Sequence, residues 1–177
     1  MSDTFTLPVI PMKNTALLPH LMMPLSVGRS RSVAAVDAAL ATEDKEIAVI
    51  SQRDSNVENP DQAGLYSYGT KAVIRKMSRP GEQHIDVLVL GTERIKLLNI
   101  EQAEPYLIGR FEAAPVKADV TPEVEALRRS VVDIAQKAFE LAEASVPAEF
   151  GQLAQGDTEP MRLAHLLASM LDRKSVV

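Results

Sequence analysis

The stretch that decides the fold covers residues 7–29 and reads LPVIPMKNTALLPHLMMPLSVGR. Four prolines, at positions 8, 11, 19 and 24, divide its Leu, Ile, Val and Met side chains. Proline has no backbone N–H and disfavours helical geometry in the residue before it, so this stretch cannot form a helix or an uninterrupted central strand. We therefore expect short extended segments joined by fixed bends, with apolar side chains on a stiff backbone.

Several motifs follow one another within this stretch and after it. They are LPVIPM at 7–12, PHLMMPL at 19–25, VGR at 27–29, IAVISQRD at 47–54, LYSYGT at 65–70 and VLGTER at 89–94. In order and spacing they resemble motifs of the amino-terminal domain of the Lon family of ATP-dependent proteases, roughly over residues 5–170. Some positions depart from that pattern: Lys13-Asn14 replace Arg-Asp, His20 replaces a common Gly, and Leu90 replaces an acidic residue.

Size and composition indicate a folded globular chain. Its 177 residues suit one domain or a domain with an appendage. The chain is 46% hydrophobic and 24% charged, which is ordinary for a globular protein. Aromatic residues make up only 4% and Trp is absent, so the core must be aliphatic, with seven Met residues able to fill irregular gaps.

Charge and cysteine content exclude several classes of protein. A net charge of −5 argues against a general nucleic-acid binder, which needs cations to displace counterions. The absence of Cys excludes disulfides and cysteine-based zinc sites and suits a reducing compartment. We see no export signal and no apolar run of about 20 residues, and therefore expect a soluble cytoplasmic protein without membrane contact.

Composition changes near residue 116, so we predict two domains, residues 1–116 and 117–177. The first has the pattern of short strands at 47–51, 68–77, 85–89, 94–100 and 106–114, with a turn at 79–82 and a break or bulge at Gly91. A helix is expected over 30–41, with Ser30 as its cap and Val33, Val36 and Leu40 on one stripe. This pattern predicts an α+β fold, with a small twisted antiparallel sheet or partly open barrel and one helix.

The second domain is predicted to be a helical subdomain. Thr121-Pro122 is a strong helix start, followed by one apolar seam made by Val124, Leu127, Val131, Ile134, Ala138 and Leu141. Pro147 ends or restarts this helix, and Gly151 and Gly156 are expected to bracket a loose connection. Residues 157–160 open another helix, whose apolar face consists of Leu163, Leu166, Leu167, Met170 and Leu171.

We find no pattern typical of catalysis, cofactor binding or metal binding. The chain has no phosphate-binding P-loop and no G-x-G-x-x-G. His20, His84 and His165 are far apart and lie in no metal-binding motif. Carboxylate pairs such as Glu43-Asp44 fall where a turn explains them. We predict no catalytic, cofactor-binding or metal-ligating residues, and no enzymatic activity for this chain alone.

One segment is predicted to contact a protein substrate. It contains Leu17, Leu18, Pro19, Leu21, Met22 and Met23. Its prolines prevent a helix that would hide one face, and adaptable Met side chains suit weak recognition of varied segments. The alternative is that the segment covers the core of the first domain. Likewise, Lys71 and Arg75 on one strand could form a cationic stripe, or charges that protect a sheet edge.

The resemblance adds further expectations. It implies a PUA-like sheet domain, and a longer parent in which a helical bundle continues, followed by an ATPase module that binds ATP and Mg²⁺ and a protease module with a Ser-Lys dyad. It implies a homohexameric enzyme of protein quality control, whose amino-terminal region binds exposed apolar segments of unfolded or damaged proteins. Two other hypotheses stay open: a stand-alone adaptor or scaffold without a protease module, and a nucleic-acid-binding domain, although nucleic acid is not the expected partner.

Overall fold

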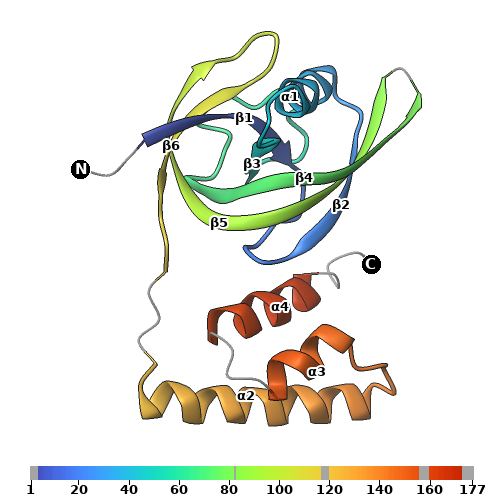
Figure 1. The fold of residues 1–177 in the computed structure, drawn as a ribbon, viewed down its shortest axis with the longest axis vertical. Coiled ribbons are helices and arrows are strands. Elements are labelled where there is room, and N and C mark those ends of the chain that lie inside the picture. The colour runs from blue at the N-terminus through green and yellow to red at the C-terminus, as the bar shows by residue number, and fades with distance from the viewer. Residues whose placement is uncertain (1–3, 82, 117–119, 156–159, 173–177) are drawn as a thin grey trace. The chain divides into compact units, whose positions relative to one another are not determined.

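The computed structural model describes residues 4–81, 83–116, 120–155 and 160–172. The chain forms two compact units, Met1–Pro115 and Val116–Val177. Figure 1 shows strands and one helix in the first unit and helices alone in the second. None of these described helices combines the length and apolarity needed to cross a bilayer.

The first unit is a mixed sheet that closes on itself. Its elements are β1 (Thr4–Met12), β2 (Met22–Val27), α1 (Ser30–Leu40), β3 (Glu46–Ser51), β4 (Tyr68–Gly81), β5 (His84–Gln102) and β6 (Ile108–Ala113). The strand order is β2-β5-β4-β3-β1-β6, and β5 also pairs with β6. The strands β5, β4, β3, β1 and β6 therefore form a closed ring, while β2 pairs only with the first half of β5.

The prediction of a wholly antiparallel sheet was wrong, because β1 and β3 are parallel. Their register runs from Val9 opposite Ala48 to Met12 opposite Ser51. Between these strands the chain passes through β2 and α1, and such a crossover lets two strands run in the same direction. The other pairings are antiparallel.

The β4–β5 ribbon is longer than predicted. The expected turn at 79–82 was wrong for Arg79, Pro80 and Gly81, which belong to β4; Glu82 lies outside the described residues. Pro80 is tolerated because this part of β4 pairs with β5 alone, so its missing N–H removes no second ladder bond. Near Gly91 the strand continues, and a register shift beside it confirms the predicted bulge.

Two apolar clusters fill the first unit. The strand β3 is buried on both faces: Ile47 and Val49 join one cluster, Ala48 and Ile50 the other. The first cluster includes Val36 of α1, which packs against β1 and β3. The predicted cap was wrong, because Arg29 is the N-cap residue of α1, without a side-chain hydrogen bond, and the helix already contains Ser30.

The second unit contains α2 (Pro122–Leu141), α3 (Ala148–Gln155) and α4 (Pro160–Asp172). The Thr121 hydroxyl accepts a hydrogen bond from the Val124 N–H at 3.3 Å, which confirms the predicted start of α2. The loose connection expected around Gly151 was wrong, because α3 includes that glycine. Burial of Phe150 against Phe139, with ring centroids 5.3 Å apart, outweighs the low helix propensity of glycine.

Candidate functional site

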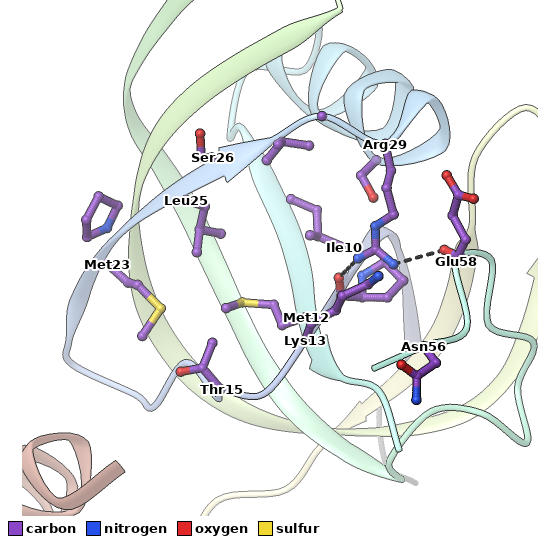
Figure 2. A pocket seen from close by; sticks show the side chains of 15 residues that line it. Ile10, Met12, Lys13, Thr15, Met23, Leu25, Ser26, Arg29, Asn56 and Glu58 are labelled. Carbon is purple, nitrogen blue, oxygen red and sulfur yellow. Dashed lines mark hydrogen bonds between the residues drawn. The ribbon is translucent and has the colours of Figure 1, made fainter. Parts of the chain in front are cut away.

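A cavity of about 640 Å³ lies in the first unit between the end of β1 and β2. Its apolar wall includes Met12 from β1 and Met23 and Leu25 from β2. Polar side chains at its margin include Lys13 and Asn56. In Figure 2 the side chains of Met12 and Leu25 point toward each other across the space between the two strands, whereas that of Ser26 points away.

The cavity exists because β1 and β2 do not pair. The strand β1 pairs with β6 through residues Thr4 to Pro8 and with β3 from Val9 to Met12, so its later half has no ladder on the other side. Pro11 and Pro24 each lack an N–H, which weakens both facing edges as donors of ladder bonds. The apolar side chains between the strands are consequently left beside open space.

Arg29 closes one end of the cavity. Its guanidinium donates hydrogen bonds to the carbonyl oxygen of Pro11 and to that of Glu58 at 3.0 Å (Figure 2). It also donates to Gln52 Oε1 at 2.9 Å. Burial lowers the pKa of Arg29 below its ordinary value, and the charge of Glu58 opposes that shift. The pKa of a guanidinium is so high that Arg29 remains a cation at neutral pH.

The buried amide of Gln52 fixes the loop that supplies Asn56 and Glu58. It donates to the carbonyl oxygens of Asp54 at 2.6 Å and Val57 at 2.8 Å while its oxygen accepts from Arg29. These bonds satisfy a polar side chain that is only 5% exposed. The loop and the end of β1 are therefore held in a defined position at the rim of the cavity.

The predicted contact segment is divided by the structure. Leu17 belongs to the apolar core and Pro19 is also buried, which is what the alternative, a segment that covers the core, predicts; substrate contact by these two residues stays a prediction. Leu18 and Leu21 are half-buried. Met22 is 56% exposed but lies outside the cavity lining, and Met23 is half-buried and lines the cavity.

Hydrogen bonds hold the backbone of this segment against the sheet, which explains why Leu17 and Pro19 are buried. The Thr70 hydroxyl donates to the carbonyl oxygen of Leu17 at 2.6 Å. The His20 N–H donates to the Gly91 carbonyl oxygen, and the Gly91 N–H donates to the Leu21 carbonyl oxygen, both at 2.9 Å. A side chain at position 91 would lie 2.6 Å from the Leu18 carbonyl oxygen, so only glycine allows this approach.

Sequence reasoning missed the cavity residues outside that segment, chiefly Met12, Lys13, Arg29 and Asn56. The sequence did contain a signal for the cavity: Pro11 lies in β1 and Pro24 in β2, and each proline removes a backbone donor from the edge of its strand. What could not be foreseen is that these two edges face each other, because that depends on the closure of the ring through β5 and β6.

One polar cluster superficially resembles a hydrolase triad. Ser26 Oγ lies 2.7 Å from His84 Nε2 and donates to Asp86 Oδ1 at 2.6 Å. In a triad the carboxylate holds the imidazole and the serine proton passes to the imidazole. Here the serine proton is directed at Asp86, and the cluster is exposed, so it does not form a catalytic arrangement.

Lys71, at the start of the predicted cationic stripe, also has structural partners. The Lys71 ammonium lies 3.1 Å from Glu46 and 2.8 Å from Glu93, so the first cation of the predicted stripe is compensated by two carboxylates. Within the described part of the chain, no group of three or more His, Asp or Glu side chains could hold a metal ion.

Comparison with known proteins identifies the class of domain. Residues 6–175 match the model of the "ATP-dependent protease La (LON) substrate-binding domain". A Lon protease of Nitrosococcus oceani is 40% identical over 93% of this chain, which corresponds to 21% of that protein. A Lon protease of Anaeromyxobacter dehalogenans is 35% identical over 94% of this chain and 20% of its own length. The chain thus spans about a fifth of these curated relatives.

Two solved structures share the fold. The N-terminal domain of the Mycobacterium avium complex Lon protease aligns over 98% of this chain and 84% of its own, with a TM-score of 0.66 and 20% identity. The Lon N-terminal domain protein of Xanthomonas campestris aligns over 93% of this chain and 98% of its own, with a TM-score of 0.56 and 24% identity. Given the family match, this chain belongs to the Lon substrate-binding domain family.

Proposed function

We propose that this chain is the substrate-recognition region of an ATP-dependent Lon-like serine protease, and that it binds exposed apolar segments of unfolded or damaged proteins. Membership of the family supports the general role. The observation that carries the specific role is the cavity between β1 and β2, whose wall includes Met12, Met23 and Leu25. Concave sites with an apolar wall and polar groups beside it are the usual binding places on a protein surface.

In this proposal an extended client segment places one apolar side chain between Met12 and Met23. Methionine is flexible and polarisable, so this wall adapts to side chains of different shape. Because Pro11 and Pro24 remove backbone donors from the adjoining edges, the client is held mainly by its side chains. Recognition is therefore broad and weak, as a protein that accepts many unfolded sequences requires.

Several copies in one assembly would compensate for that weakness. We propose that the parent is a cytoplasmic homohexamer, in which linked sites raise the effective concentration of a bound client and so its overall affinity. ATP and Mg²⁺ would act in the ATPase module of the parent, and peptide hydrolysis in its protease module. This region would supply client capture and support for the assembly, with no catalytic residue of its own.

Adjacent methionines provide a matched test of the cavity. Binding of the chain to a fluorescently labelled, permanently unfolded polypeptide is measured by anisotropy. Met23→Lys places a charge in the cavity wall and is expected to weaken binding by about tenfold, the equivalent of about 1.4 kcal/mol. Met22→Lys changes the neighbouring outward residue and is expected to alter affinity by less than about twofold.

The thermal unfolding of both variants is measured as well. A variant that unfolds at the same temperature as the unmodified chain is folded, so its loss of affinity reports on binding alone. Equal loss of binding in the two variants would exclude the cavity as the contact site. No binding by the unmodified chain at millimolar polypeptide would exclude client capture by this region.

A further inference from the structure

The cavity between β1 and β2 has a polar end as well as an apolar wall. Met12 and Met23 belong to the wall. At the beginning of α1 the lining changes to Gly28, Arg29 and Ser32. In Figure 2 the Arg29 side chain extends from the start of α1 toward β1, beside the space that Met12 faces. One ligand can therefore contact apolar and polar groups at once.

Ser32 is a polar residue that the fold buries without giving its hydroxyl a partner. It is 4% exposed, and its side chain makes no hydrogen bond with any other described residue. Buried hydroxyls in folded proteins almost always have a hydrogen-bond partner. Because Ser32 lines the cavity, that partner can be an atom of a bound ligand. The hydroxyl can donate to such an atom, so we expect the ligand to present an acceptor here.

The first turn of α1 adds backbone donors beside this hydroxyl. The Val33 N–H donates to the Arg29 carbonyl oxygen at 2.9 Å, and the N–H groups before it have no acceptor within the helix. The N-cap residue, Arg29, makes no side-chain cap hydrogen bond, and the first turn, which the structure describes in full, contains no acidic residue. Unpaired N–H groups and the helix dipole favour an anion at such an end. Together with the buried Ser32 hydroxyl, they indicate a negatively charged acceptor.

The charges that line the cavity also favour an anion. Lys13 and Arg29 contribute two cations and Glu58 one carboxylate, although the whole chain carries a net charge of −5. Lys13 is exposed and forms no ion pair with another described residue, and the hydrogen-bond acceptors of Arg29 are uncharged. Figure 2 shows the Glu58 carboxylate turned away from the space between the two strands. The cavity therefore keeps a local positive charge for a ligand.

The same end of the cavity is closed to a continuing chain. Arg29 is hydrogen-bonded both to the Pro11 carbonyl oxygen in β1 and to the Glu58 carbonyl oxygen in the following loop, so it bridges the two segments. A polypeptide that lies along the apolar wall therefore ends at this bridge or turns away from it. The end of a chain carries a carboxylate of its own, whose two oxygens can accept from several N–H and O–H groups. A C-terminus thus suits both the charge and the closed shape.

We propose that the α1 end of this cavity binds the C-terminal carboxylate of a client chain whose last side chain is apolar and packs against Met12 and Met23. This inference rests on the client site proposed above and names the class of segment that the site prefers. The Ser32 hydroxyl, the N–H groups of the first turn of α1 and the Arg29 guanidinium hold the carboxylate. A terminal carboxylate also makes polar contacts that the proline-containing strand edges cannot make with a peptide backbone.

Two peptides that differ only in their last group test this assignment. A short fluorescein-labelled peptide ending in leucine is prepared with a free C-terminal carboxylate and with a C-terminal amide, and the full 177-residue chain is titrated into each. We expect fluorescence anisotropy to show at least about tenfold tighter binding of the free acid, because only the acid accepts charge-assisted hydrogen bonds. A third peptide combines the amide with a glutamate before the leucine and is expected to bind like the plain amide. Binding of this third peptide as tightly as the free acid would overturn the assignment to a chain end.

Ser32→Ala and Ser30→Ala provide a matched pair within the first turn of α1. Ser32→Ala removes the buried hydroxyl and is expected to weaken binding of the free acid by about tenfold. Its affinity for the amide peptide should stay within about twofold of the unmodified value, which shows that the variant is folded. Ser30 is exposed and does not line the cavity, so Ser30→Ala should leave both affinities unchanged. Equal affinity of Ser32→Ala and the unmodified chain for the free acid would overturn the role of the hydroxyl.

The outcomes separate this inference from the client site on which it rests. Preferred binding of the free acid, weakened by Ser32→Ala and not by Ser30→Ala, is the predicted result. If the acid and the amide bind equally tightly, the carboxylate assignment is wrong, while capture of clients by the apolar wall stands. If neither peptide binds at about 1 mM chain, the client site is wrong as well.

Discussion

In the closed ring, each of the strands β1, β3, β4, β5 and β6 pairs with at least two neighbours, whereas β2 pairs with β5 alone. Ring residues such as Phe111 and Ile95 are fully buried by these pairings. The β2 margin, residues 13–29, is held on one side only, by the pairing of β2 with β5 and by individual contacts to Thr70, Gly91 and Gln52. The cavity proposed to bind clients lies beside it. The difference shows that a stable scaffold and an open apolar surface can be made from neighbouring strands when proline prevents the last pairing.

The largest effect is expected in the ring. Phe111 is fully buried, and Phe111→Ala should lower the free energy of unfolding by about 3–5 kcal/mol because it leaves a cavity in the core. Met22→Ala, in the exposed part of the margin, should change the free energy of unfolding by less than about 0.5 kcal/mol. Urea unfolding followed by circular dichroism measures both. Similar losses in the two variants would contradict the distinction between ring and margin.

A smaller effect is expected where the margin is attached to the ring. In Gly91→Ala the new methyl group meets the Leu18 carbonyl oxygen, and moving the backbone away should cost about 1–3 kcal/mol. Gly81→Ala is the matched control, because nothing lies within 4 Å of a methyl group there. Amide hydrogen exchange should accelerate around residues 17–21 in Gly91→Ala alone. Unchanged exchange would show that the contact at Gly91 does not hold the margin.

Lys71 tests the electrostatics on the outside of the ring. Burial lowers the pKa of Lys71, but hydrogen bonds to Glu93 and Glu46 raise it more, so the pKa in the folded chain lies above the ordinary 10.5. The ion pairs therefore contribute stability below pH 10.5 that is lost as pH rises through the higher, folded pKa. We expect the stability difference between the unmodified chain and Lys71→Met to be constant from pH 7 to 9 and to shrink above pH 10.5. A difference that grows with pH would contradict this assignment.

The smallest effect is expected at His20 in the margin. This residue has a φ of 68°, in the left-handed region that glycine adopts without steric cost. His20→Gly should raise the free energy of unfolding by up to about 1 kcal/mol, because relief of this strain outweighs the added freedom of the unfolded chain. Thermal unfolding measures the gain. A loss of stability would show that the histidine side chain makes a contribution larger than the backbone strain.

The sequence predicted the elements of the ring better than their arrangement. Alternation at Ile85, Val87 and Val89 predicted the buried face of β5, since each strand carries its own period of two. The parallel pairing of β1 with β3 was not predictable from such local patterns, because it depends on how distant segments meet. The continuation of α3 past Gly151 was not predicted for a similar reason: burial of Phe150 is a tertiary effect that opposes the local preference of Gly151.

The candidate site was predictable only in part. Adaptable methionines between prolines pointed to Met22 and Met23, but alternation along β2 places their side chains on opposite faces, and only Met23 lines the cavity. Arg29 could be noticed as the end of the V-G-R motif, yet its three hydrogen-bond acceptors come from two distant segments, β1 and residues 52–58. A site assembled by long-range closure cannot be derived from one stretch of sequence.

The central claim, that clients enter the cavity between β1 and β2, is tested most directly by NMR of ¹³C-methyl-labelled methionine. The seven methionines report separately on the cavity, the outer face and the rest of the chain. On titration with an unfolded polypeptide, we expect the Met12 and Met23 methyl signals to shift in a saturable way, with little change at exposed Met77 on β4. Saturable shifts at Met77 or Met161, with Met12 and Met23 unmoved, would contradict the claim.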